Sequence, residues 1–315
     1  MADKGLFLQN VIALIWDFDK TLSPYYMQRP IFEAYGEDER AFWDEVRALP
    51  AYYRRAGIRV QEDTCYLGHL LAYVKHGKFQ GLTNAKLKEL GARISFFPGI
   101  PEFFARLQSI IDEGPFAAGD LRLEHYVVST GLDAMIRGSA IAPYIKDVWA
   151  SVFIEEPARP GDDFSEVPVS GPISQIAGFL DNTTKTRALF EINKGVNAEG
   201  SISVNDAIPE EERRVPFKNM IYIADGPSDI PSFSVVRKHG GLAFAVYDSG
   251  SEEHYSQALS LQETQRVNMI GPADYRDGSE TDRWLRNQVR RIAERMMDER
   301  RRATESRVTR GPVHL

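Results

Sequence analysis

Two pairs of acidic residues follow short hydrophobic segments of the chain, where carboxylates can do chemistry. Asp17 and Asp19 come directly after residues 11–16, and Asp225 and Asp229 follow residues 219–224. Both segments are rich in β-branched residues and too short for buried helices, which predicts buried parallel strands. Ligands bind outside the carboxyl ends of strands in such sheets, so we expect both pairs at a reactive edge. An isolated D-x-D is also typical of a plain acidic turn, so the rest of the chain decides between these interpretations.

Three further polar residues follow in the order that such a site requires. Residues 123–129 form another hydrophobic segment that ends on Ser129, and Thr130 and Gly131 come next. Lys185 begins a helical pattern between the second and third segments. Strands joined by right-handed crossovers end at one edge of a sheet, so residues far apart in sequence are expected to meet there.

Each of these residues also has a purely structural interpretation. Ser129 and Thr130 are good helix caps, Lys185 is compatible with a surface lysine, and Asp229 with the N-cap of a following helix. The three carboxylates of Asp17, Asp19 and Asp225 are harder to explain in this way. Gathered at one edge without a cation, they would repel one another and raise each other's pKa.

The order of these motifs resembles that of the haloacid dehalogenase (HAD) superfamily, in particular its phosphoserine-phosphatase-like members. The matching residues are D-x-D-x-T at 17–21, Ser129, Lys185 and the acidic strand end from Asp225 to Asp229, within a span from Val11 to Val246. The resemblance implies that Asp17 attacks phosphorus and binds Mg²⁺. It also implies that Asp19 is the general acid and base, with its backbone carbonyl as a second metal ligand.

The resemblance assigns roles to the other residues too. Asp225 would be the third metal ligand, and Lys185 would neutralise the charge of Asp17 and of the transferred phosphoryl group. Asp229 would hold a metal-bound water or orient Lys185. Groups that receive phosphoryl oxygens would be the Ser129 hydroxyl and the amides of Phe18, Thr130 and Gly131, the last two at the start of a helix, while Thr21 would brace the loop.

The expected fold class is α/β, a Rossmann-like three-layer parallel sheet. The core would comprise residues 1–22 and 98–315, with a flap or hairpin at about 151–182 and a C-terminal helix at about 279–302. Residues 23–97 mix aromatic and charged residues at helical spacing, and by the resemblance they would form a helical cap. The alternative is an ordinary helical layer of one domain. Under both interpretations, six residues of this segment could face a substrate cleft or be solvated: Tyr52, Tyr53, Arg54, Arg55, Arg59 and His76.

Composition limits the possible partners and compartments. The chain has 315 residues, 43% of them hydrophobic and 26% charged, with a net charge of −7. This acidity argues against nucleic acid as a partner. Asp17 interrupts the N-terminal hydrophobic run, so we expect no membrane span. The single cysteine, Cys65, favours a reducing, cytoplasmic location. Nothing in the sequence indicates the oligomeric state.

The resulting hypothesis is a Mg²⁺-dependent phosphatase that hydrolyses a small phosphorylated metabolite through an aspartyl-phosphate intermediate. Asp19 argues against dehalogenase chemistry, because a phosphatase needs a proton donor for its leaving group. Two alternatives remain. One is a phosphomutase with the same residues, and the other is a non-catalytic binding protein that keeps the fold.

Overall fold

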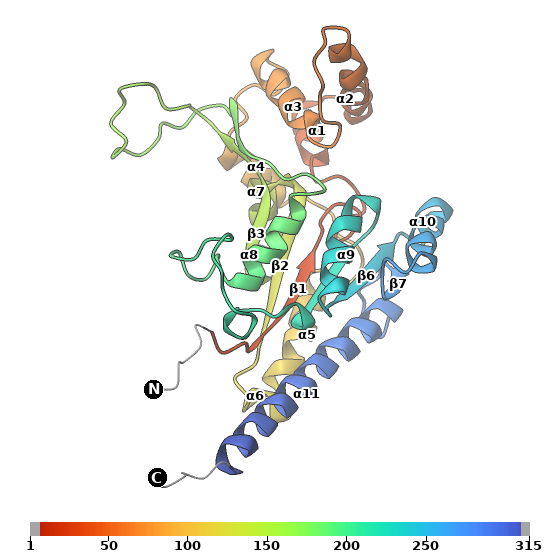
Figure 1. Cartoon of the computed structure of the whole chain (residues 1–315). Helices are drawn as coiled ribbons and strands as arrows, with labels where there is room; N and C mark the ends of the chain where they lie inside the picture. Colours follow the sequence, from red (N-terminus) through yellow and green to blue (C-terminus); the bar gives the residue numbers. More distant parts are fainter. Residues whose placement is uncertain (1–6, 310–315) are drawn as a thin grey trace.

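A seven-stranded sheet forms the centre of the protein (Figure 1). The computed structural model describes residues 7–309, with side chains through residue 305, so the ends of the predicted core range, 1–6 and 310–315, lie outside it. The strand order is β4-β3-β2-β1-β5-β6-β7, and all neighbours are parallel except β3 and β4. The strands are β1 (Val11–Trp16), β2 (Arg122–Leu132), β3 (Ile145–Ile154), β4 (Gln175–Gly178), β5 (Met220–Ala224), β6 (Leu242–Tyr247) and β7 (Met269–Pro272).

Strand β1 shows why both faces of this sheet are covered. Its six residues are all buried, and alternate side chains belong to two separate hydrophobic clusters. Ile12, Leu14 and Trp16 join one cluster, while the residues between them join the other. Because side chains of a strand alternate between faces, a parallel strand without polar positions must be sandwiched between two helical layers. The predicted three-layer α/β class is therefore confirmed.

The helices divide between the two faces according to these clusters. The face of Trp16 is covered by α5 (Glu102–Asp112), α6 (Gly114–Ala117), α7 (Asp133–Gly138) and α11 (Glu280–Thr309). The other face is covered by α8 (Lys185–Lys194), α9 (Ile230–Lys238) and α10 (Glu252–Glu263). Short 3₁₀ turns lie at Ala142–Tyr144, Glu210–Glu212, Phe217–Asn219 and Pro227–Asp229. Among residues 7–309, no helix is both long and apolar enough to cross a lipid bilayer.

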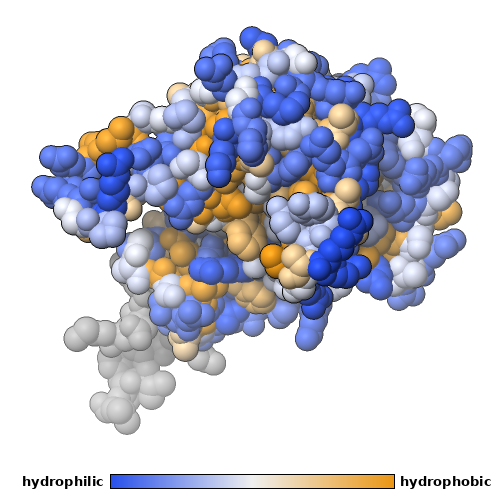
Figure 2. Space-filling view, turned by 90° about the horizontal axis from the view of Figure 1, so that it is seen from above, coloured by the Kyte–Doolittle hydropathy of each residue, from blue (hydrophilic) through white to orange (hydrophobic). Residues whose placement is uncertain are grey.

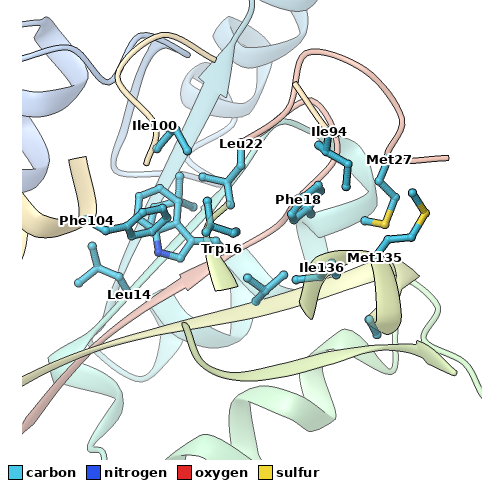
Figure 3. Packing of buried hydrophobic residues seen from close by; sticks show 14 of the residues in the cluster. Leu14, Trp16, Phe18, Leu22, Met27, Ile94, Ile100, Phe104, Met135 and Ile136 are labelled. Carbon is cyan, nitrogen blue, oxygen red and sulfur yellow. The ribbon is translucent and has the colours of Figure 1, made fainter. Parts of the chain in front are cut away.

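Four helices lie between β1 and α5 in the sequence. They are α1 (Arg29–Tyr35), α2 (Glu39–Arg54), α3 (Cys65–Lys75) and α4 (Asn84–Gly91), and they lie beyond the ends of the central strands (Figure 1). The hydrophobic residues at the two ends of this helical segment are continuous with the sheet: Met27, before α1, and Ile94, after α4, lie in the same cluster as Leu14 and Trp16 (Figure 3). Helix α4 packs against α7 so closely that Gly138 has no room for a side chain, since a Cβ there would lie 1.8 Å from the Lys88 carbonyl oxygen.

Several boundaries differ from the sequence expectation. Strand β2 continues to Leu132 instead of ending at Ser129, because its tip keeps pairing with β3 after an irregularity in the register. The predicted flap contains β4, which pairs antiparallel with β3 at the sheet edge, and a long loop that projects from the body of the protein (Figure 1).

Candidate active site

The register of the central strands brings the predicted residues to one edge. Trp16 pairs with Val127 of β2 and with Ile223 of β5, so Asp17 emerges level with the end of β5. The backbone amide of Asp17 donates to the Ile223 carbonyl, 2.9 Å away, which holds the first residue after β1 in line with the sheet. Asp17 is 5% exposed. Its position is therefore fixed by backbone pairing before any side-chain contact is considered.

Lys185 joins two of the predicted carboxylates. Its Nζ lies 2.7 Å from Asp17 Oδ1 and 2.8 Å from Asp229 Oδ1, and the lysine is 1% exposed. Burial alone would lower the pKa of Lys185, but the charges of Asp17 and Asp229 outweigh it and hold the pKa well above its usual range. The surface-lysine interpretation is therefore wrong: Lys185 is a buried cation at the first turn of α8.

Asp229 is engaged entirely by neighbouring side chains. Besides Lys185, it accepts hydrogen bonds from the Tyr222 hydroxyl on Oδ1 at 2.5 Å and from the Ser228 hydroxyl on Oδ2 at 2.7 Å. It occupies the N-cap position of α9, but its side chain makes no capping hydrogen bond. This disproves the N-cap interpretation: the Asp229 side chain is a buried ion-pair partner of Lys185.

Asp19 lies on the loop after β1, beside Asp17. Its Oδ1 accepts from the Met27 amide at 2.8 Å, and both aspartates line one cavity. Burial, reinforced by the charge of Asp17, raises the pKa of Asp19 well above its usual range. A raised pKa lets a carboxyl group keep its proton to higher pH, which suits a group that donates a proton to a leaving group.

Asp225 has no hydrogen-bond or ion-pair partner among the described residues, although it is only partly exposed. Oxygen atoms of Asp17, Asp225 and Asp229 lie within 4.8 Å of one another. Burial and the charges of Asp17 and Asp229 raise the pKa of Asp225 to about 8, and burial raises that of Asp17 to about 6. Two carboxylates with raised pKa values and too little positive charge nearby form a ligand set that suits a hard divalent cation.

The remaining predicted residues surround Asp17. Thr21 Oγ1 lies 3.3 Å from Asp17 Oδ2, and the Phe18 amide interacts with the same carboxylate. Ser129 lines the cavity with Thr130, and its Oγ accepts from the Gly131 amide at 3.0 Å. The expectation that Thr130 and Gly131 begin a helix is wrong: they lie within β2, and α7 begins at Asp133.

A cavity of about 500 Å³ opens at this edge of the sheet. The sheet side is lined by Asp17, Asp19, Ser129, Thr130, Lys185 and Asp225. The side of the inserted helices is lined by Tyr26, Gln28, Trp43, Val46, Arg47 and Tyr66. A polar floor under a partly aromatic roof is typical of a small-molecule site in which the polar groups fix the reacting atoms.

Sequence reasoning missed several residues around this cavity. For Tyr222, the only signal in the sequence was its position on β5, three residues before Asp225. The Tyr66 hydroxyl donates to the Thr130 carbonyl at 2.6 Å and so ties α3 to the end of β2. Nothing in the local sequence distinguishes Tyr66 from a core tyrosine.

Comparison with known proteins adds a relative and a set of structural likenesses. No family model matches the chain. A protein of Borreliella burgdorferi, described only as uncharacterized, is 36% identical over 290 residues, which cover 89% of this chain and 97% of that protein.

The solved structures that this chain resembles have lower sequence identity to it. A substrate-bound phosphoserine phosphatase is 16% identical, with 82% of this chain and 91% of that chain covered and a TM-score of 0.47. A probable phosphoserine phosphatase from Vibrio cholerae is 12% identical, with 94% and 69% covered and a TM-score of 0.47. The sheet brings the D-x-D-x-T motif, Ser129, Lys185 and Asp225 to one edge, in the α/β arrangement that those motifs predict. The chain belongs to the same family as the Borreliella burgdorferi protein.

Proposed function

We propose that the protein is a Mg²⁺-dependent phosphatase that hydrolyses a small phosphorylated molecule through an aspartyl-phosphate on Asp17. The observation that carries the proposal is the buried bridge from Asp17 through Lys185 to Asp229, at the floor of a cavity that also contains Asp19 and Asp225. Phosphate monoesters are dianions that repel nucleophiles, so a catalyst must first supply positive charge and alignment. This edge of the sheet supplies both.

In the first step, Asp17 attacks phosphorus and the bond from phosphorus to the leaving oxygen breaks. Asp19 donates its proton to that oxygen, so the leaving group departs as a neutral alcohol. Lys185 balances negative charge on Asp17 and on the phosphoryl oxygens. The Ser129 hydroxyl, which lines the cavity, is placed to donate to one of those oxygens.

In the second step, the ionised Asp19 takes a proton from water, which attacks the phosphorus of the aspartyl-phosphate. The bond between phosphorus and Asp17 breaks, inorganic phosphate is released and Asp19 regains its proton. One residue thus serves as acid and then as base, a double role that suits a carboxyl group whose pKa is raised.

Asp17, Asp225 and the Asp19 backbone carbonyl would hold the metal ion. Mg²⁺ prefers one or two carboxylates together with water and phosphate oxygens, and when bound it supplies positive charge to the nucleophile and the phosphoryl group. Asp229 is the less suitable ligand because its oxygens already accept hydrogen bonds from Lys185, Tyr222 and Ser228. We further propose that residues 23–97 act as the cap that covers the cavity, and that the enzyme is cytoplasmic, as its single cysteine suggests.

The test is phosphate release from p-nitrophenyl phosphate with Mg²⁺ and with EDTA. Asp17→Asn is expected to lower turnover by at least about a thousandfold, because the amide is a poor nucleophile, while leaving the fold intact. EDTA is expected to silence the wild type and Mg²⁺ to restore it. Asp277→Asn, an exposed aspartate outside the cavity, is the matched control.

Two results would contradict the proposal: unchanged turnover by Asp17→Asn, or full activity in chelator. Phosphate redistribution within a substrate, without release of free phosphate, would indicate a phosphomutase instead.

A further inference from the structure

A second hollow opens beside the catalytic cavity, between the end of α2 and the loop that follows it. Its volume is about 540 Å³, and it is lined by Pro50, Arg54, Arg59, Val60, Gln61 and Glu62. We call it the arginine groove. Glu62 lines the catalytic cavity as well, so the two hollows adjoin at this residue.

Helix α2 runs from one hollow to the other. Val46 and Arg47 line the catalytic cavity, and Pro50 and Arg54 line the arginine groove. Positions 47, 50 and 54 are three, four and seven residues apart and so lie on one face of the helix. Seven residues of α-helix span about 10 Å, which sets the distance between the roof of the cavity and the groove.

The two arginines of the groove have no ion-pair partner among the described residues. Arg54 and Arg59 are exposed, and neither forms an ion pair with a described carboxylate. Other arginines of the same segment are paired: Arg29 with Glu39, and Arg47 with Asp44. The groove therefore holds two guanidinium groups without ion-pair partners, and one acidic residue, Glu62, lines it at the junction with the catalytic cavity.

We propose that the arginine groove binds a second phosphate group of the substrate while the first lies at Asp17. The inference rests on the proposed phosphatase function and names its substrate class, a small molecule with a phosphate at each end that is long enough to reach from Asp17 into the groove. A guanidinium group forms two parallel, charge-assisted hydrogen bonds with a phosphate, and two arginines match its double charge better than the single charge of a carboxylate. Glu62 repels an anion held where the two hollows adjoin, so the second phosphate is favoured beside the guanidinium groups instead.

The experiment compares esters that differ only in the second anion. The probes are alkanediol bisphosphates of increasing chain length, the matching monophosphates and the matching phosphoalkyl carboxylates, all measured by phosphate release at constant ionic strength. We expect kcat/KM for the best bisphosphate to exceed that of its monophosphate by about tenfold or more, mainly through KM. The carboxylates are expected to gain less, and short bisphosphates nothing.

Four variants locate the effect. Arg54→Ala and Arg59→Ala are each expected to reduce the ratio of bisphosphate to monophosphate activity by about tenfold, with most of the loss in KM. Arg55→Ala is the matched control, because Arg55 is an exposed neighbour of the same charge that does not line the groove. It should leave the ratio within about twofold of the wild type. Arg54→Lys should restore part of the ratio, because it keeps the charge.

The outcomes separate this inference from the function on which it rests. Turnover of p-nitrophenyl phosphate with equal kcat/KM for bisphosphates and monophosphates would overturn the groove and leave the phosphatase in place. A ratio that Arg55→Ala lowers as much as Arg54→Ala would also overturn the groove, because it would reflect general charge. A preference for the carboxylates would overturn the phosphate assignment. Release of phosphate from none of the esters would overturn both proposals.

Discussion

The carboxyl edge of the sheet and the helical segment beyond it hold their charged residues in opposite ways. At the edge, Asp17, Lys185 and Asp229 are at most 5% exposed and each has a fixed partner. In the helical segment, Arg54 and Arg59 are exposed and form no ion pair with a described residue. The buried charges are arranged before any substrate arrives, which is how electrostatic catalysis avoids reorganisation during the reaction. The exposed charges remain available to a ligand.

This difference assigns the geometry of the reacting groups and the recognition of the substrate to two different parts of the molecule. The geometry of the reacting groups depends on strand register and burial, so it is part of the stability of the fold. By our proposals, recognition of the rest of the substrate depends on the helical segment. Figure 2 shows that the face of the molecule seen from above is mostly hydrophilic. Changes at the edge should therefore affect both folding and chemistry, whereas changes in the arginine groove should affect only substrate choice.

The largest effect is expected from Lys185→Met, which breaks the buried half of the comparison. It leaves two carboxylates buried without their cation, so the free energy of unfolding in EDTA should fall by about 3–5 kcal/mol, and activity should fall by at least about a hundredfold. Adding Asp229→Asn should recover part of the stability, because one uncompensated charge is removed, but none of the activity. Urea unfolding and phosphate release measure the two quantities.

Lys238→Met, at the exposed end of α9, is the control for that experiment. If Lys185→Met kept wild-type stability and activity, the bridge between Asp17 and Asp229 would be unimportant to both, and the contrast between the two regions would disappear.

His125 sharpens the comparison, because it is a buried titratable group of the sheet without a charged partner. The Trp16 indole lies 3.2 Å from its Nδ1, and Nε2 has no partner among the described residues. Burial lowers the pKa of His125 to about 3. Since the unfolded chain takes up this proton near pH 6.5 and the folded protein does not, the stability contributed by neutral His125 is complete above that pH and is lost on acidification.

The expected loss is about 1.4 kcal/mol per pH unit between pH 6.5 and about pH 3. Urea unfolding at several pH values should therefore show a steeper acid decline for the wild type than for His125→Gln. Parallel declines would mean that His125 is protonated in the folded protein, against its buried position.

A smaller effect is expected from Gly138→Ala, which disturbs the joint between the two regions. The new Cβ would lie 1.8 Å from the Lys88 carbonyl oxygen, so α4 and α7 must separate. Overpacking of this kind costs about 1–3 kcal/mol, measured as a fall in the free energy of unfolding. Gly68→Ala is the control, because nothing lies within 4 Å of a Cβ there and alanine favours the α-helix that contains it. Equal stability of both variants would show that the joint tolerates separation.

Most of the sheet and the acidic residues of the site could be predicted from the sequence. Hydrophobic runs that end in carboxylates indicate strand ends, and the order of the motifs was enough to expect Asp17, Asp19, Asp225, Ser129 and Lys185 at one edge. These features are local patterns joined by general rules of chain topology.

Contacts between distant segments could not be predicted in this way. That Tyr222 donates to Asp229, or Tyr66 to the Thr130 carbonyl, depends on how helices dock and which rotamers they permit. The extension of β2 to Leu132 depends on its pairing with β3, which no pattern within β2 indicates. Register and docking are tertiary properties, and local propensity does not determine them.

The most direct test of the account is to trap the phosphorylated enzyme. Protein mixed with Mg²⁺ and p-nitrophenyl phosphate and quenched in acid within the first turnover should carry one phosphoryl group, and peptide mass spectrometry should place it on Asp17. The Asp17→Asn variant should carry none. Turnover with Asp17 unmodified, or with the phosphoryl group on another residue, would contradict the central claim that this carboxylate is the nucleophile.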